Sequence, residues 1–155
     1  MHARGFTLVE VLTALAILVV AALATVQVLI VAAAAMHDAR VHTSTAMLAA
    51  QHMEQLLALD WGVPELSLSP SDTLEANVGG YVDYLDSAGT TLGTSVSPPA
   101  GAAFVRRWAV DPYPDSGGET IVIRILVRSL AADAGGRRGG RGEARLVTLR
   151  TRVAR

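Results

Sequence analysis

The stretch RGFTLVEVLTALAILVVAALATVQVLIVAAAAM, residues 4–36, dominates the first third of this chain of 155 residues. From Val11 to Met36 it carries no charged side chain, and its only polar residues are Thr13, Thr25 and Gln27. About 20 consecutive apolar residues are enough for a helix to cross the hydrocarbon core of a membrane. The stretch therefore predicts a membrane-spanning helix with a single carboxylate, Glu10, at its entrance.

The helix is predicted to continue well beyond the apolar stretch. No glycine or proline stands between Phe6 and Trp61, and these two residue types are the strongest helix breakers. After Asp38 the pattern becomes amphipathic, with one face formed by Val41, Thr45, Leu48, His52, Leu56 and Leu59. We expect one helix from about Phe6 to about Asp60, ended by Gly62 and Pro64.

Composition limits what the rest of the chain can be. The remaining residues suffice for one small domain and are too few for two. The chain has no cysteine, which excludes disulfides, thiolate metal sites and cysteine nucleophiles. Residues 60–119 carry nine acidic residues against two arginines, and residues 120–155 carry nine arginines against two acidic residues. These opposed blocks either pair within one domain or attract neighbouring copies.

Alternating apolar and polar residues predict an antiparallel sheet in this domain. A hairpin is expected at residues 78–96, turning at Asp86 to Gly89, followed by a strand from Phe104 to Val110. In the next strand, residues 120–130, the residues expected to face the core are Ile121, Ile123, Ile125 and Val127, with Arg124 and Arg128 opposite. In the last strand, residues 144–154, those expected to face inward are Val147, Leu149 and Val153, with Arg150 and Arg152 outward. Such a sheet, packed on the amphipathic half of the helix, gives an α+β fold.

An N-terminal apolar segment is also typical of a cleaved secretory signal peptide. Arg4 fits the basic start of such a peptide, and Ala22-Leu23-Ala24 fits its cleavage site. Three features oppose this interpretation: the carboxylate of Glu10, an apolar pattern that continues beyond Ala24, and a helix pattern that runs on to Asp60 without a break.

The segment RGFTLVE, residues 4–10, resembles the processing site of type IV pilins and pseudopilins. In that family a short basic leader ends in glycine, a phenylalanine becomes the new N-terminus, and a glutamate is the fifth residue of the mature chain. The resemblance implies cleavage by the prepilin peptidase between Gly5 and Phe6, methylation of the Phe6 nitrogen and a role for Glu10 in subunit assembly.

The resemblance also implies a pilin-like fold and divides the chain into four parts. These are a leader at residues 1–5, a transmembrane or filament-core helix at 6–37, an amphipathic helix at 38–62 and an antiparallel β head at 63–155.

Physical chemistry supports the role implied for Glu10. An unpaired carboxylate in a membrane costs a few kcal/mol, so an acid at this place is a functional candidate. Cleavage would give Phe6 an α-amine with a pKa of about 7.7 to 8, largely cationic at neutral pH and one helical turn away. In pilins the glutamate is thought to pair with the N-terminal amine of a neighbouring subunit, which penalises a wrong axial register.

The function expected from the resemblance is that of a structural subunit, not an enzyme, without cofactor or metal. Its expected location is the bacterial cytoplasmic membrane, crossed once with the head outside the cytoplasm, and then a pilus or pseudopilus. Its expected partners are the prepilin peptidase/methyltransferase, other pilin or pseudopilin subunits and the membrane. AMLAAQHMEQLLALDWG, residues 46–62, is most similar to minor pilins of the PilV type and to the minor pseudopilin I of type II secretion.

A glycine- and arginine-rich segment, residues 135–142, suggests a rival function. Arg137, Arg138 and Arg141 could contact the phosphates of nucleic acid. The protein would then be a membrane-anchored binding module that never joins a filament. Because no aromatic residues are interleaved for base stacking, a plain hairpin loop is favoured.

Other candidate sites are weaker. Asp111, Asp115 and Glu119 could hold Ca²⁺, but their spacing matches no known cation loop and favours a turn. His37, His42 and His52 lack the i, i+4 spacing of a helical metal pair, which favours surface histidines. The sequence has no nucleophile elbow, phosphate loop or paired-acid arrangement, so catalysis is not expected.

Overall fold

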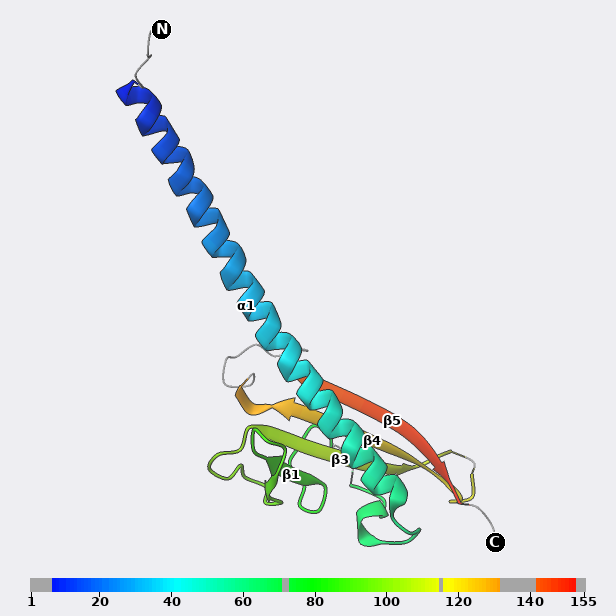
Figure 1. Cartoon of the computed structure of the whole chain (residues 1–155). Coiled ribbons are helices and arrows are strands. Elements are labelled where there is room, and N and C mark those ends of the chain that lie inside the picture. Colours follow the sequence, from blue (N-terminus) through cyan, green and yellow to red (C-terminus); the bar gives the residue numbers. More distant parts are fainter. Residues whose placement is uncertain (1–6, 71–72, 115, 132–141, 153–155) are drawn as a thin grey trace. The chain divides into compact units, whose positions relative to one another are not determined.

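The computed structural model of the chain describes residues 7–70, 73–114, 116–131 and 142–152. The chain divides into two compact units, Met1–Ala39 and Arg40–Arg155. Figure 1 shows one long helix followed by a small sheet, which confirms the predicted α+β, pilin-like layout. The elements are α1 (Leu8–Ala58), the short 3-10 helix η1 (Pro64–Leu66), β1 (Val82–Leu85), β2 (Thr91–Gly93), β3 (Phe104–Pro112), β4 (Thr120–Ser129) and β5 (Glu143–Thr151).

Helix α1 is continuous for 51 residues, as the absence of glycine and proline predicted. Beyond its end, Gly62 takes the left-handed backbone conformation, with φ of +95°, which favours glycine. Arg150 of β5 donates hydrogen bonds from Nη1 to the Leu56 carbonyl oxygen at 3.0 Å and from Nη2 to that of Leu59. The arginine thus satisfies carbonyls that have no partner within the helix.

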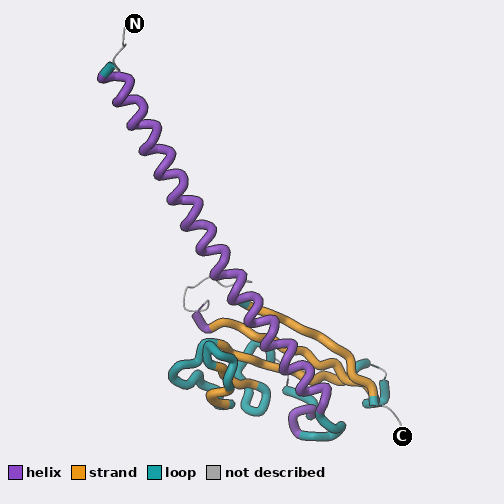
Figure 2. The backbone as a smooth tube through the Cα atoms, in the orientation of Figure 1, coloured by secondary structure: helices purple, strands orange, loops and turns teal. Residues whose placement is uncertain are grey.

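The five strands form one antiparallel sheet in the order β2-β1-β3-β4-β5. Figure 2 shows the strands in orange and the helix in purple. The predicted hairpin is present as β1 and β2. Its turn is held by Asp86, whose Oδ1 accepts hydrogen bonds from the amides of Ala88 and Thr90, each at 2.8 Å. An aspartate that bonds nearby backbone amides in this way is typical of tight turns.

One face of the sheet packs against about the last four turns of α1. The buried helix residues are Thr45, Leu48, Ala49, His52, Met53 and Leu56. The sheet contributes Leu85, Phe104, Trp108, Val110, Ile121, Ile123, Ile125 and Val127 to the same core. The prediction for β4 is therefore confirmed: its four core residues face the helix, and Arg124 and Arg128 lie on the other face.

The opposite face of the sheet is buried in part as well. Leu74, from the segment between η1 and β1, packs against Ala109 and Leu126. A third cluster joins Val82, Tyr84 and Val105. The central strands are thus covered on both sides, whereas the edge strand β5 has exposed apolar side chains on this face.

The predicted orientation of β5 was wrong. Thr148 pairs with Ile123 and Leu146 with Ile125, so the even-numbered residues of β5 face the helix. Val147 and Leu149 lie on the other face and are 66% and 57% exposed. Arg150 faces inward because its guanidinium donates hydrogen bonds to carbonyl oxygens at the end of α1. Its guanidinium carbon also lies 5.7 Å from the centre of the Trp61 ring. Val153 lies outside the described residues.

The opposed charge blocks pair within the domain. Asp111 and Arg124 approach to 2.6 Å, and Glu75 and Arg145 to 2.9 Å. In each pair the acid comes from residues 60–119 and the arginine from residues 120–155. Of the two alternatives left open by the sequence, pairing within one domain accounts for these residues.

A polar cluster lies under the helix. Asp83 of β1 and Arg106 of β3 stand directly opposite each other, and each is only 5% exposed. Arg106 donates from Nε to Asp83 Oδ1 at 3.0 Å and from Nη2 to Oδ2 at 2.6 Å. This is a buried bidentate ion pair, the strong geometry for arginine and carboxylate.

His52 lies beside this pair and is not the surface histidine that the sequence predicted. It is 8% exposed because it belongs to the sheet-facing side of α1, and its ring meets that of Trp108 edge-on at 4.8 Å. His37 and His42 are exposed. Burial and the nearby Arg106 charge lower the pKa of His52, although the hydrogen bond to Gln55 opposes this shift.

The lowered pKa of His52 predicts that acid destabilises the head. An unfolded histidine has a pKa near 6.5, so below about that pH the unfolded state binds a proton that the folded state resists. Neutral His52 therefore contributes to the stability of the head above about pH 6.5. This contribution is lost as the pH falls through the lower pKa of the folded state, and the free energy of unfolding then falls by at most about 1.4 kcal/mol per pH unit. Urea unfolding followed by tryptophan fluorescence between pH 7 and 5 measures this slope. His52→Gln should reduce it, whereas His42→Gln should not; equal slopes in both variants would contradict the assignment.

Candidate functional site: the N-terminal segment of α1

The start of α1 is fixed by Thr7. The Glu10 amide donates to the Thr7 carbonyl oxygen at 3.1 Å and to Thr7 Oγ1 at 3.3 Å. A threonine hydroxyl that accepts from the third residue of a helix is an N-cap. This role was not predicted from the sequence, although Thr7 and Glu10 match the S/T-x-x-E pattern of a capping box.

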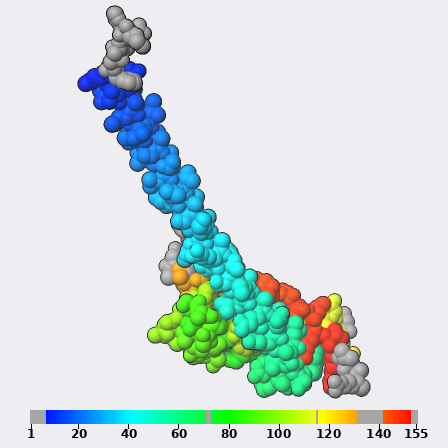
Figure 3. Space-filling view, viewed as in Figure 1, coloured from blue at the N-terminus to red at the C-terminus, as the bar shows by residue number. Residues whose placement is uncertain are grey.

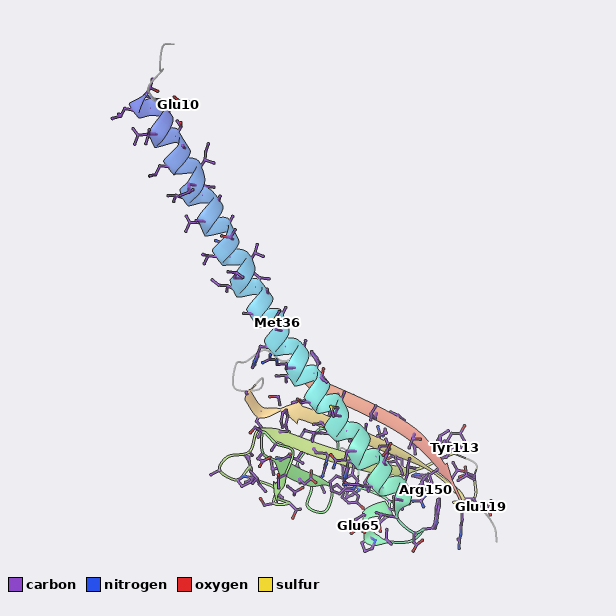
Figure 4. The ribbon with its side chains drawn as sticks, viewed as in Figure 1. Glu10, Met36, Glu65, Tyr113, Glu119 and Arg150 are labelled. Atoms are coloured by element: carbon purple, nitrogen blue, oxygen red, sulfur yellow. The ribbon has the colours of Figure 1, made fainter. Side chains whose placement is uncertain are left out.

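Glu10 lies in the first turn of α1 and is exposed (Figure 4). The helix dipole favours a negative charge at this end. Gly5 and Phe6, the predicted cleavage and methylation residues, lie outside the described residues. The structure therefore places the Glu10 carboxylate at the beginning of the helix, three residues after the Thr7 cap.

From Val11 to Met36 the helix exposes all of its large apolar side chains (Figure 4). Figure 3 shows the near side of this part of the helix in space-filling form. Its polar hydroxyls bond back to the helix: Thr13 donates to the Glu10 carbonyl oxygen at 3.0 Å, and Thr25 to that of Ala22 at 2.7 Å. These bonds leave the hydroxyls satisfied in an apolar environment. By length and composition α1 can cross a membrane, and none of the 18 residues in its most apolar stretch is buried.

The other predicted sites are not assembled by the described residues. Arg137, Arg138 and Arg141, like Asp115, lie outside them. The Asp111 carboxylate is bound by Arg124, which competes with any cation. The described residues hold no group of three or more histidine, cysteine or acidic residues able to bind a metal.

Comparison with known proteins identifies the N-terminal segment alone. The family model described as the prokaryotic N-terminal methylation motif matches residues 1–26. No curated protein and no solved structure matches the chain. The matched residues include the Gly5-Phe6 bond, Glu10 and more than half of the apolar stretch. The chain thus carries a prepilin-type N-terminal methylation motif at the start of an exposed apolar helix. This combination supports the type IV pilin-like family, a structural class of prepilin peptidase substrates.

Proposed function

We propose that the protein is a minor pilin or pseudopilin, a subunit of a type IV pilus or of a type II secretion pseudopilus. The observation that carries this proposal is the methylation motif at residues 1–26, which includes the first turns of a helix whose apolar surface is exposed on all sides. Such a surface suits both a lipid environment and a bundle of like helices, because the contacts in either are apolar.

The proposed maturation begins with cleavage between Gly5 and Phe6 on the cytoplasmic side, followed by methylation of the new amine. The Thr7 cap lies beyond the cleaved bond, so the start of α1 is retained in the mature chain. The amine of Phe6 and the carboxylate of Glu10 then lie one turn apart at the same end of the helix. In an assembled filament we expect Glu10 to pair with the amine of a neighbouring subunit.

The proposed topology is a single membrane crossing by residues 6–37, with the domain from residue 63 onward outside the cytoplasm. Arg4 in the leader favours the cytoplasmic side for the N-terminus, since positively charged flanks are retained there. During assembly the helix would exchange lipid neighbours for the helices of other subunits while the head remains folded.

The experiment that tests maturation is the intact mass of the protein taken from its native membrane, with sequencing of its N-terminal fragment. We expect a chain that begins at methylated Phe6. Gly5→Leu should leave the chain at Met1, because the predicted cleavage site is altered while the apolar helix is unchanged. A wild-type chain that begins at Thr25 would mean a secreted protein, and one that begins at Met1 a plain membrane anchor; either result overturns the proposal.

A membrane-anchored DNA-binding module remains the second candidate, carried by the Gly/Arg segment at 135–142. Its affinity would rest on arginine-phosphate contacts and would fall with salt. Changing Arg137, Arg138 and Arg141 together to serine should weaken binding and flatten its salt dependence if this function is real. Unchanged binding would exclude it without touching the filament proposal.

A further inference from the structure

Arg40 is the only lysine or arginine in helix α1, and its side chain is exposed. It comes four residues after Met36 (Figure 4), the last residue of the apolar stretch that begins at Val11. The helix is continuous through both residues. At a rise of about 1.5 Å per residue, Arg40 therefore lies about 6 Å beyond Met36 along the helix axis.

This spacing matches the depth of the lipid headgroups in a membrane. The hydrocarbon core is about 30 Å thick and the bilayer with its headgroups about 40 to 45 Å, so each headgroup layer is about 5 to 7 Å deep. Membrane helices tilt by up to about 40°, and at that tilt four residues still advance about 5 Å across the membrane. With Met36 at the outer boundary of the core, Arg40 thus lies in the headgroup layer at any usual tilt.

The length of the apolar stretch makes the position of Met36 important. From Val11 to Met36 the helix is about 39 Å long, which exceeds the thickness of the core. A tilt near 40° keeps the whole stretch inside the core, whereas a smaller tilt leaves apolar side chains in the headgroup layer or in water. A polar contact just beyond Met36 would hold the outer end of the stretch at the membrane surface and favour the tilted arrangement.

The neighbouring acid does not neutralise Arg40. Asp38 is the nearest acidic residue of α1, but residues two apart on a helix do not face each other. Asp38 is half-buried and lies on the side of the helix that carries the buried Thr45 two turns later, whereas Arg40 is exposed. A guanidinium offers paired N–H donors that match two oxygens of a phosphate. The anion that fits Arg40 in a headgroup layer is thus a lipid phosphate.

We infer that Arg40 binds the phosphate of a phospholipid in the headgroup layer on the side of the head, and so holds the outer end of the apolar stretch at the membrane surface. This inference rests on the proposed membrane crossing but not on processing or filament assembly. One arginine near an anionic membrane surface contributes about a fivefold preference for the bound state. The test therefore has to resolve single arginines.

The experiment measures how fast a water-soluble phenylglyoxal, which modifies accessible guanidinium groups, reacts with Arg40 in the full chain. Peptide masses give the rate for each arginine separately. The chain is placed in vesicles of phosphatidylcholine and phosphatidylglycerol and, for comparison, in vesicles of digalactosyldiacylglycerol, whose headgroups carry no phosphate. Both kinds of vesicle shield the helix alike, but only the first offers phosphate. We expect Arg40 to react about fivefold more slowly in the phospholipid vesicles.

Arg152 is the matched control within the same molecule. It is exposed and lies two residues after Arg150, which bonds to carbonyl oxygens at the far end of α1. Its rate should be the same in both kinds of vesicle, and the ratio of the Arg40 rate to the Arg152 rate corrects for chains inserted in the opposite direction. An equal ratio in both kinds of vesicle would overturn the inference, because Arg40 would then be merely solvated.

A second comparison separates a lipid phosphate from a free one. In micelles of a neutral sugar detergent Arg40 should react fast, and added inorganic phosphate should not slow it as the phospholipid vesicles do. Equal protection by inorganic phosphate would overturn the inference, since the site would then bind a free anion. The proposed maturation is tested separately by the N-terminal mass, so a chain that begins at methylated Phe6 can still contradict the role given to Arg40.

Discussion

Replacing Glu10 with alanine is expected to leave the protein in the membrane and to exclude it from filaments. Membrane insertion depends on the apolar surface of α1, which the substitution does not change. Assembly would lose the carboxylate that neutralises the amine of a neighbouring subunit, and a charge without its partner in an apolar bundle is strongly unfavourable. Because every 1.4 kcal/mol is a factor of ten, we expect the incorporated fraction to fall at least about tenfold.

The measurement is the fraction of the protein that sediments with sheared filaments, compared with the fraction in the membrane. Glu10→Gln separates the effect of charge from that of shape, because it removes the charge and keeps the size of the side chain. It should be excluded from filaments nearly as strongly as Glu10→Ala. Glu54→Ala is the matched control, because Glu54 is an exposed acid on the same helix outside the apolar stretch. If Glu10→Ala assembles like the wild type, or if Glu54→Ala fails equally, pairing at Glu10 is not what selects the subunit.

The long helix could be predicted because its signals are local. The lack of glycine and proline over more than 50 residues, the apolar run and the amphipathic pattern all concern residues within a few turns of each other. The four main strands were found for the same reason, since an alternation of period two is readable within one strand. The cap at Thr7 was equally local and readable from its spacing to Glu10.

The orientation of β5 could not be read in this way. Both faces of β5 carry uncharged residues, because Leu146 and Thr148 lie on one face and Val147 and Leu149 on the other. Alternation alone therefore does not say which face points inward. The phase is decided by Arg150, which reaches the carbonyls of Leu56 and Leu59, more than 90 residues away. An arginine counted as outward by polarity is held inward by acceptors that only the folded helix presents.

The buried pair of Asp83 and Arg106 was missed for a related reason. The two residues are 23 positions apart and meet only through the register of β1 and β3. His52 was assigned to the surface because its spacing does not fit a helical metal pair, although its place on the apolar face of the helix already indicated burial. Polar residues inside a core depend on long-range partners, so composition assigns them to the surface by default.

Removing the Arg106 side chain should be among the most damaging single changes to the head. Arg106→Ala leaves the Asp83 carboxylate buried without its partner, and breaking a buried pair in this way costs about 3 to 5 kcal/mol. Small domains are stable by only about 5 to 15 kcal/mol, so the urea midpoint of the head should fall by a large part of its value. Tryptophan fluorescence measures this transition, because Trp108 lies in the same core.

Two further variants make the Arg106 prediction specific to a buried charge. Arg124→Ala breaks a pair whose side chains are 43% and 38% exposed, and exposed pairs contribute about 0 to 1 kcal/mol, so its effect should be small. The double change Asp83→Leu with Arg106→Met removes both charges and keeps apolar bulk between β1, β3 and the helix. It should recover most of the lost stability, because the cost lies in the unpaired carboxylate and not in the absence of an ion pair. If the double variant is as unstable as Arg106→Ala, the pair acts through its shape and hydrogen bonds, and the unpaired Asp83 carboxylate is not what destabilises Arg106→Ala.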